Sequence, residues 1–239
     1  MQTRKVLAVL ALTTNVPLSA DQIVSRIWDG DPPLSAAQMV RNQVRILRHL
    51  AGTAHRGIIE RSQTGYLLAD GVEVDATQFA ALVQQARAAR SGASALCTVQ
   101  RALALWRGSE ALVGVRDVPL LDAAAVTLEE VRFQTEEFLA DCYLTLGQPN
   151  DALPLLQGMT VRHPSRQLPW LRLMAAQSLV GRRAEAAVET YRRARHHLVE
   201  ETGLDAHMLA DVHRALLREV DGREIIAMIS RNGEWGPTR

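Results

Sequence analysis

The chain has 239 residues, of which 47% are hydrophobic and 22% charged, and its formal net charge is +1. This composition is that of an ordinary globular protein, and it excludes a collagen-like chain, a disordered chain and a polyelectrolyte. No apolar run is long enough to span a bilayer, and two cysteines in apolar helical surroundings do not indicate a disulfide framework. The expected location is therefore the cytoplasm.

Charge is distributed unevenly along the chain. Residues 1–68 contain eight Lys and Arg against four Asp and Glu, whereas the remainder contains 19 and 22. A basic N-terminal segment followed by a mildly acidic remainder is typical of a nucleic-acid-binding module joined to a second domain. An excess of basic residues of this size is also common on ordinary solvated surfaces.

The first 50 residues predict three helices. Residues 4–14 are apolar nearly all round, which indicates a helix buried on more than one side. Two basic residues precede the apolar run, as in a secretion signal, but the run is short and no small-residue cleavage site follows it. Ser19 is a good N-cap for a second helix over 20–28, where Trp28 is expected to be core, and Ser35 caps a third helix that ends near Leu50.

Residues 57–68 contain two short apolar runs around a polar turn with glycine, which predicts a β-hairpin. The order of two helices, a longer helix and a hairpin is that of a winged helix-turn-helix. We assign this domain to residues 1–70.

From residue 75 onward the pattern is all helical and contains an internal repeat. Helices are predicted at 75–90, 94–106, 119–146, 150–163, 166–180, 183–202 and 205–220. Gly147 recurs as Gly181 and Leu139 as Leu173, an offset of 34 residues, which is the tetratricopeptide (TPR) period. We therefore predict a mainly α protein in which a TPR-like domain over 75–220 follows the winged helix. The tail 221–239 holds an apolar run at 225–229 that would cap the repeats or dock a partner.

The third predicted helix carries the strongest functional signal. Val40, Val44 and Leu47 form its core stripe, and the opposite stripe lacks acidic residues. Arginine can bond the O6/N7 edge of guanine, and Asn or Gln can pair with adenine in the major groove. An ordinary solvated helix is the alternative, but such helices usually include Glu or Asp for local pairing. The candidate DNA-binding residues are Gln38, Arg41, Asn42, Arg45, Arg48 and, in the hairpin turn, Arg61.

Several stretches resemble a known family. "LSADQIVSRIWDGDPP", "VRNQVRILRHLAG" and "RSQTGYLL" are similar to the response-regulator-type winged helix of the antibiotic regulatory protein (SARP) family. "RALALWRG", "AAVETYRRARHHLVEETGLD" and "VHRALL" resemble its bacterial transcriptional activator domain. The resemblance covers about residues 4–218 and implies an activator of a secondary-metabolite gene cluster, such as one for antibiotic biosynthesis. Such a protein binds direct repeats in promoter DNA, where two copies can form a homodimer. It recruits RNA polymerase holoenzyme at the nucleoid.

The resemblance further implies that the loop with Asp29, Gly30 and Asp31 contacts RNA polymerase. The chain departs from the family in two ways. It begins at the first helix, where family members have a small antiparallel sheet, so we expect a truncated domain with an uncovered first helix, or a sheet encoded upstream. Ile46 stands where the family commonly has Arg, which removes one expected phosphate contact.

Two alternatives belong to other classes of function. An enzyme is not expected, because phosphate-loop, HExxH, CxxC and GxSxG motifs are missing from the sequence. Neither a catalytic site nor a metal or cofactor is predicted, since His196 and His197 are adjacent and should point to different faces of a helix. A TPR-like interaction scaffold whose degenerate winged helix no longer binds DNA is the remaining alternative.

Overall fold

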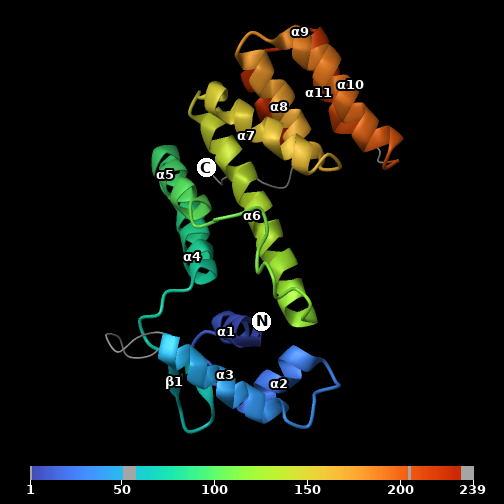
Figure 1. Ribbon diagram of the computed structural model, residues 1–239. Helices are drawn as coiled ribbons and strands as arrows, with labels where there is room; N and C mark the ends of the chain where they lie inside the picture. Colours follow the sequence, from blue (N-terminus) through green and yellow to red (C-terminus); the bar gives the residue numbers. More distant parts are fainter. Residues whose placement is uncertain (1, 51–57, 204–205, 233–239) are drawn as a thin grey trace. The chain divides into compact units, whose positions relative to one another are not determined.

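The computed structural model describes residues 2–50, 58–203 and 206–232, and its regular elements are helices apart from one small sheet (Figure 1). The chain clusters into two compact units. Unit 1 contains the residues up to Ala80 together with Ala104–Phe133, and unit 2 contains Ala81–Leu103 and the residues from Gln134 onward. The boundary predicted near residue 70 assigns residues 104–133 to the second domain, whereas their contacts group them with the winged helix.

Unit 1 begins with the three helices that the sequence predicts. They are α1 (Gln2–Leu12), α2 (Ala20–Trp28) and α3 (Ala36–Leu50). Ser19 caps α2 in a capping box: the Gln22 amide donates to Ser19 Oγ at 3.1 Å, and the Ser19 amide donates to Gln22 Oε1 at 2.8 Å. These reciprocal bonds satisfy two amides that would otherwise lack partners at the start of the helix.

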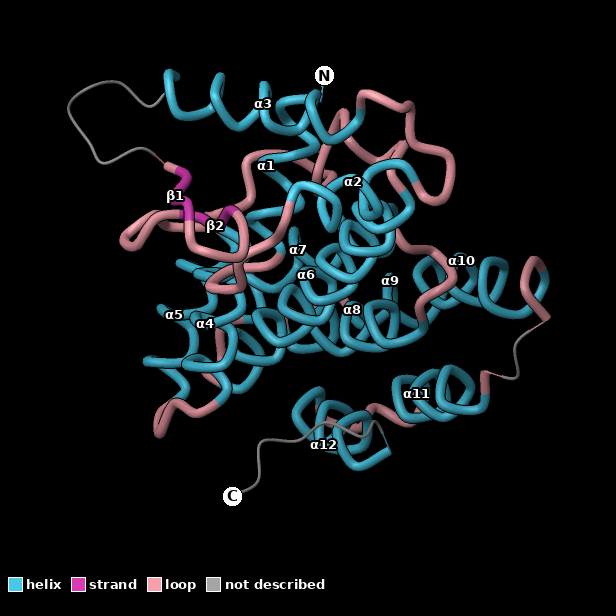
Figure 2. Tube along the Cα trace, turned by 90° about the horizontal axis from the view of Figure 1, so that it is seen from below, coloured by secondary structure: helices cyan, strands magenta, loops and turns pink. Residues whose placement is uncertain are grey.

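The predicted hairpin is present as β1 (Ile59–Arg61) and β2 (Tyr66–Leu68), which pair antiparallel with Ile59 opposite Leu68 (Figure 2). Gly57, where the hairpin was predicted to begin, lies outside the described residues. Leu18, just before α2, forms a β-bridge with Tyr66 through two backbone bonds of 2.8 Å. A Cβ on Gly65 would lie 2.2 Å from the Leu18 carbonyl oxygen, so only glycine allows this close approach.

The first helix is covered, contrary to the expectation from the sequence. Val6, Val9 and Leu10 are each only 1% exposed. They share one core with α2, α3, the hairpin and a segment that precedes the long helix α6 (Pro119–Thr145). That segment and the first turn of α6 contribute Val115, Val118 and Leu121. Apolar side chains from later in the chain thus bury the face that was expected to lack a partner, although Leu12 remains exposed.

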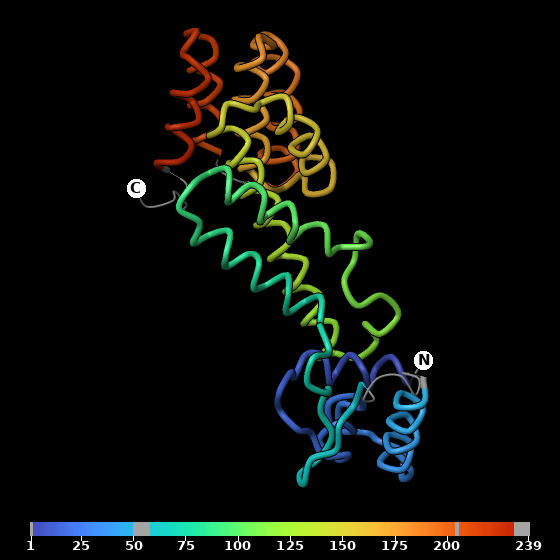
Figure 3. Tube along the Cα trace, turned by 90° about the vertical axis from the view of Figure 1, so that its left-hand side faces the viewer, coloured from blue at the N-terminus to red at the C-terminus, as the bar shows by residue number. Residues whose placement is uncertain are grey.

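The remaining helices follow the predicted order with small shifts at their ends. They are α4 (Asp75–Arg87), α5 (Gly92–Leu103), α7 (Pro149–Arg162), α8 (Gln167–Leu179), α11 (His207–Leu217) and α12 (Gly222–Asn232). In unit 2, α8 is buried at every residue from Pro169 to Ser178. It packs against α7, α11 and α12 (Figure 3). Leu204 and Asp205 lie outside the described residues.

The repeat detected in the sequence corresponds to a repeated helix C-cap. Gly147 and Gly181 both have positive φ, at 72° and 79°. Gln148 N donates to Tyr143 O and, 34 residues later, Arg182 N donates to Gln177 O, each at 2.8 Å. These are Schellman caps, in which a left-handed residue lets two amides bond carbonyls of the last turn. The same conformation therefore recurs at the predicted period.

Residues 183–200 form one uninterrupted helical run that is π-helical in two places. The run consists of α9 (Arg183–Glu185), η1 (Ala186–Thr190), α10 (Tyr191–Arg195) and η2 (His196–Glu200). Tyr191 N bonds the Ala186 carbonyl and Glu201 N bonds the His196 carbonyl, each five residues earlier, so the side-chain periodicity differs locally from that of an α-helix. The sequence predicts only an ordinary helix here.

The predicted tail is ordered as α12 over the part that the structure describes. Ile225 is fully buried and Ile229 nearly so. A Cβ on Gly222 would lie 2.7 Å from Leu179 Cγ, which shows how closely α12 approaches the end of α8. The apolar run at 225–229 therefore caps unit 2. Among the described helices, none is both long and apolar enough to cross a membrane.

Candidate nucleic-acid interface

One side of α3 faces the core of unit 1 and the other faces solvent. Val40, Val44 and Leu47 are between 0 and 4% exposed, as the apolar periodicity predicts. The side chains of the opposite stripe are all exposed. We call them the open face of α3: Gln38, Arg41, Asn42 and Arg45.

The open face is weakly organised by its own hydrogen bonds. Gln38 Nε2 donates to Asn42 Oδ1 at 3.4 Å, and an Arg41 guanidinium nitrogen donates to Gln38 Oε1 at 3.4 Å. Both bonds are long, so a stronger partner would displace them readily. No carboxylate occurs in the sequence between Asp31 and Glu60, so the cations of this face are not neutralised by neighbours on the helix.

Arg48 lies apart from the open face. Its Nε donates to the Ile59 carbonyl of β1 at 3.1 Å, and its guanidinium carbon lies 5.9 Å from the centre of the Tyr66 ring. The side chain is half-buried. Arg48 therefore joins the end of α3 to the hairpin, a role that the stripe pattern does not reveal. Arg61, at the end of β1, is exposed as expected for a wing residue.

The loop after α2 is held in a tight left-handed turn. Asp29 ends the helix with φ 32°, Gly30 follows with φ 104°, and Asp31 N donates to the Trp28 carbonyl at 3.1 Å. All three residues are exposed, and Leu34 beyond them is fully exposed. The carboxylates of Asp29 and Asp31 give this loop a negative charge, which would repel DNA phosphates. Sequence reasoning missed Leu34.

The motif Trp106-Arg107-Gly108 has a packing role within unit 1. The Trp106 ring meets Phe79 edge to face at 5.7 Å, and the Arg132 guanidinium lies 4.7 Å from its centre. Arg132 also donates to the Gly108 carbonyl at 2.7 Å, and Arg107 pairs with Asp75 at 2.8 Å. The three motif residues line a cavity of about 420 Å³ whose wall includes Ala8 and Leu12 of α1.

Unit 2 contains a buried ionic cluster around Arg172. Its guanidinium bonds both oxygens of Asp141 at 2.7 Å and Glu137 at 2.9 Å. Burial raises the pKa of both carboxyls, and the charge of Arg172 opposes that rise. The cluster connects α6 and α8 through bidentate bonds, an arrangement that fixes the packing of helices.

Comparison with known proteins identifies the family. The bacterial transcriptional activator domain matches residues 74–217. The regulatory protein DnrI of Streptomyces peucetius is 30% identical over 98% of this chain and 88% of its own length. The transcriptional regulatory protein MoaR1 of Mycobacterium tuberculosis is 28% identical over 95% of this chain and 76% of its own.

A solved structure has the same fold. Mycobacterium tuberculosis EmbR, in complex with a low-affinity phosphopeptide, superposes with a TM-score of 0.79 at 25% identity. The match covers 96% of this chain and 63% of the EmbR chain. These relatives are transcription regulators, which agrees with the expectation that this protein is not an enzyme. The chain therefore belongs to the antibiotic regulatory protein family of transcriptional activators.

Proposed function

We propose that the protein activates transcription by placing α3 in the major groove of promoter DNA. The observation that carries the proposal is the open face of α3, where four exposed side chains able to read base edges lie opposite a fully buried core stripe. An α-helix fits the major groove of B-DNA, and Arg, Asn and Gln are the side chains that read guanine and adenine there.

Within this face, Arg41, Asn42 and Arg45 approach base edges, and Gln38 supports Arg41. Arg61 of the wing meets phosphate or the adjacent minor groove. Arg48 holds α3 against β1 through its bond to Ile59 O. In this proposal its remaining guanidinium nitrogens contact phosphate. The sites are direct repeats in promoters of a secondary-metabolite gene cluster, where two copies of the chain bind side by side.

The loop with Asp29, Gly30 and Asp31 recruits RNA polymerase in this proposal. Its two acids repel DNA phosphates, and the exposed side chain of Leu34 supplies an apolar contact for a protein partner. A variant with Leu34→Ser and Asp31→Ala should bind DNA like the wild type and fail to activate transcription in a reconstituted assay. If a folded variant lost both DNA binding and activation, the loop could not be assigned to polymerase recruitment alone.

The DNA-binding step is tested by selection from a random double-stranded library, followed by binding measurements on the enriched sequence. Arg41→Ala should weaken binding by about 1–3 kcal/mol and relax the preference at one base pair. Arg101→Ala on α5, which also removes an exposed cation, is the matched control and should have little effect. If no sequence is enriched, the protein is an interaction scaffold whose winged helix no longer reads DNA.

A further inference from the structure

The end of the helical run in unit 2 brings together two histidines and a glutamate. The η2 segment is π-helical, and Glu201 N donates to the His196 carbonyl at 3.0 Å, a bond that spans five residues. In an α-helix the residue that stacks against His196 would be three or four positions away. The π-turn places Glu201, five positions away, beside His196 in addition to Glu200, and His197 reaches Glu201 from four positions away. The prediction that the two histidines point to different faces is therefore wrong.

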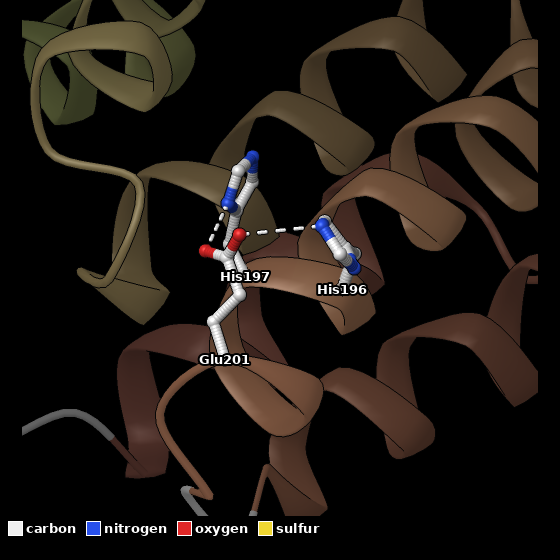
Figure 4. A group of neighbouring side chains, drawn as sticks. All are labelled: His196, His197 and Glu201. Atoms are coloured by element: carbon white, nitrogen blue, oxygen red, sulfur yellow. Dashed lines mark hydrogen bonds and ion pairs between the residues drawn. The ribbon is translucent and has the colours of Figure 1, made fainter.

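Both imidazoles contact the same carboxylate (Figure 4). His196 Nε2 lies 3.2 Å from Glu201 Oε1, and His197 Nδ1 lies 2.7 Å from Glu201 Oε2. One donor atom from each of the three residues falls within 4.8 Å of the other two. Bonds of about 2.0–2.2 Å to one zinc ion require donor atoms separated by about 3.3 Å, so small side-chain rotations suffice to enclose a cation.

Neighbouring groups orient both rings. Glu200 Oε2 lies 3.0 Å from His196 Nδ1. A proton held on Nδ1 by that carboxylate leaves the lone pair of Nε2 directed at Glu201, as in the carboxylate–histidine–metal arrangement of natural sites. The His197 ring stacks on Trp170 with centroids 5.9 Å apart and an angle of 24° between the planes. Trp170 is fully buried, so it provides a rigid support for this ring.

We propose that His196, His197 and Glu201 form a binding site for a divalent transition-metal cation of the Zn²⁺ type. Two imidazole nitrogens and one carboxylate oxygen are ligands that zinc accepts in a tetrahedral site, and water completes the fourth position. The side chains of Glu200 and Glu201 supply negative charge, which the guanidinium of Arg195, 4.0 Å from Glu200, partly offsets. The three ligands are between 30 and 55% exposed, so the site is accessible to the ion.

Occupancy of this site would stabilise the last turn of the run. A ligand that binds only the folded chain raises its stability in proportion to the logarithm of its concentration over the dissociation constant. Because all three ligands lie within six consecutive residues, the effect should be local to residues 196–201 and the helices that pack on them. The proposal is independent of DNA binding by α3, so neither result decides the other.

The test uses full-length protein without a polyhistidine tag and Zn²⁺ alone as the probe. Competition with a chromophoric zinc indicator should give one equivalent of bound Zn²⁺. Glu201→Gln and His196→Ala should each weaken binding at least tenfold, and Glu200→Gln, which removes only the orienting carboxylate, by about tenfold. His49→Ala, which removes an exposed imidazole from α3, should bind Zn²⁺ like the wild type.

A second measurement does not depend on the folding of variants. Co²⁺ bound to the wild-type protein should show the intense visible absorption of a four- or five-coordinate site, and Zn²⁺ should abolish it. If the wild type binds no stoichiometric Zn²⁺, or if Glu201→Gln binds it as tightly as the wild type while remaining helical, the proposal is overturned. The contacts would then be only ion pairs between histidines and glutamates.

Discussion

Lys5 of α1 donates to the carboxylate of Asp117, a residue 112 positions further along the chain, at 2.5 Å. The lysine side chain is nearly buried, whereas the aspartate is half-exposed. The pair joins the first helix of unit 1 to the segment that precedes α6. Val115 and Val118 lie in the same segment as Asp117 and belong to the core that includes α1. One segment therefore supplies both the counter-charge for Lys5 and apolar side chains to that core.

The ion pair leads to a prediction about stability. Asp117→Asn should lower the free energy of unfolding by about 1–2 kcal/mol, because it leaves a buried ammonium without its counter-charge. Lys5→Met should be less harmful, since it removes the charge and keeps the volume. The exposed pair of Arg107 and Asp75 is the control, and Arg107→Ala should change stability by less than about 0.5 kcal/mol. Urea unfolding measures all three; equal effects of Asp117→Asn and Arg107→Ala would contradict the assignment.

The apolar cover of α1 is tested by two adjacent leucines. Leu121 is 0% exposed and Leu120 is 43% exposed. Leu121→Ala should lower stability by about 2–5 kcal/mol and accelerate hydrogen exchange in α1, although the substitution lies outside the winged helix. Leu120→Ala should leave exchange in α1 unchanged. If α1 retains its protection in Leu121→Ala, its stability does not depend on the segment before α6.

The helix caps of unit 2 yield a stabilising substitution. Glu219 has φ 59° and makes the bonds of a Schellman cap, with Val220 N donating to Ala215 O at 3.0 Å. It occupies the position that Gly147 and Gly181 hold at earlier helix ends. Glu219→Gly should raise the melting temperature through a gain of about 0.5 kcal/mol, because glycine adopts positive φ without strain. Glu219→Ala keeps the strain and should give no gain, and Gly147→Ala should lose about 1 kcal/mol.

The two cysteines should differ in reactivity. Burial raises the pKa of the Cys142 thiol to about 11, and the nearby carboxylate of Asp141 adds to the rise. At pH 8 the thiolate of Cys142 is therefore a very small fraction, while Cys97 is exposed. Mass spectrometry after brief treatment with iodoacetamide should find the label on Cys97 alone. Unfolding in urea should make both residues react, and labelling of Cys142 in the folded protein at a comparable rate would refute its burial.

The elements of the winged helix could be predicted because their signals are local. The spacing of Val40, Val44 and Leu47 defines the buried side of α3, and Ser19 defines the start of α2. The cover of α1 could not be predicted in this way. Val115 and Val118 share a core with it from more than 100 residues away, and an apolar pattern alone does not reveal which distant segment supplies the partner.

In the candidate sites, too, the features set by local spacing could be predicted and those set by distant contacts or an unusual helix could not. The open face of α3 follows from helical spacing, but the bond from Arg48 to the Ile59 carbonyl depends on how the hairpin returns to the helix. The prediction that His196 and His197 point to different faces of the helix assumes α-helical periodicity. A π-turn changes that periodicity by one residue, and nothing in the local composition distinguishes it from an ordinary helix.

Under the proposed function, the attachment of Arg48 to the hairpin has a consequence for redesigning the preferred DNA sequence. A combinatorial library that varies the four positions of the open face would leave the orientation of α3 intact, because the residues that orient it lie elsewhere. Including position 48 would mix two effects, since each substitution there would also remove the bond to the Ile59 carbonyl. Selections for new target sequences should therefore randomise Gln38, Arg41, Asn42 and Arg45 and hold Arg48, Tyr66 and Gly65 constant.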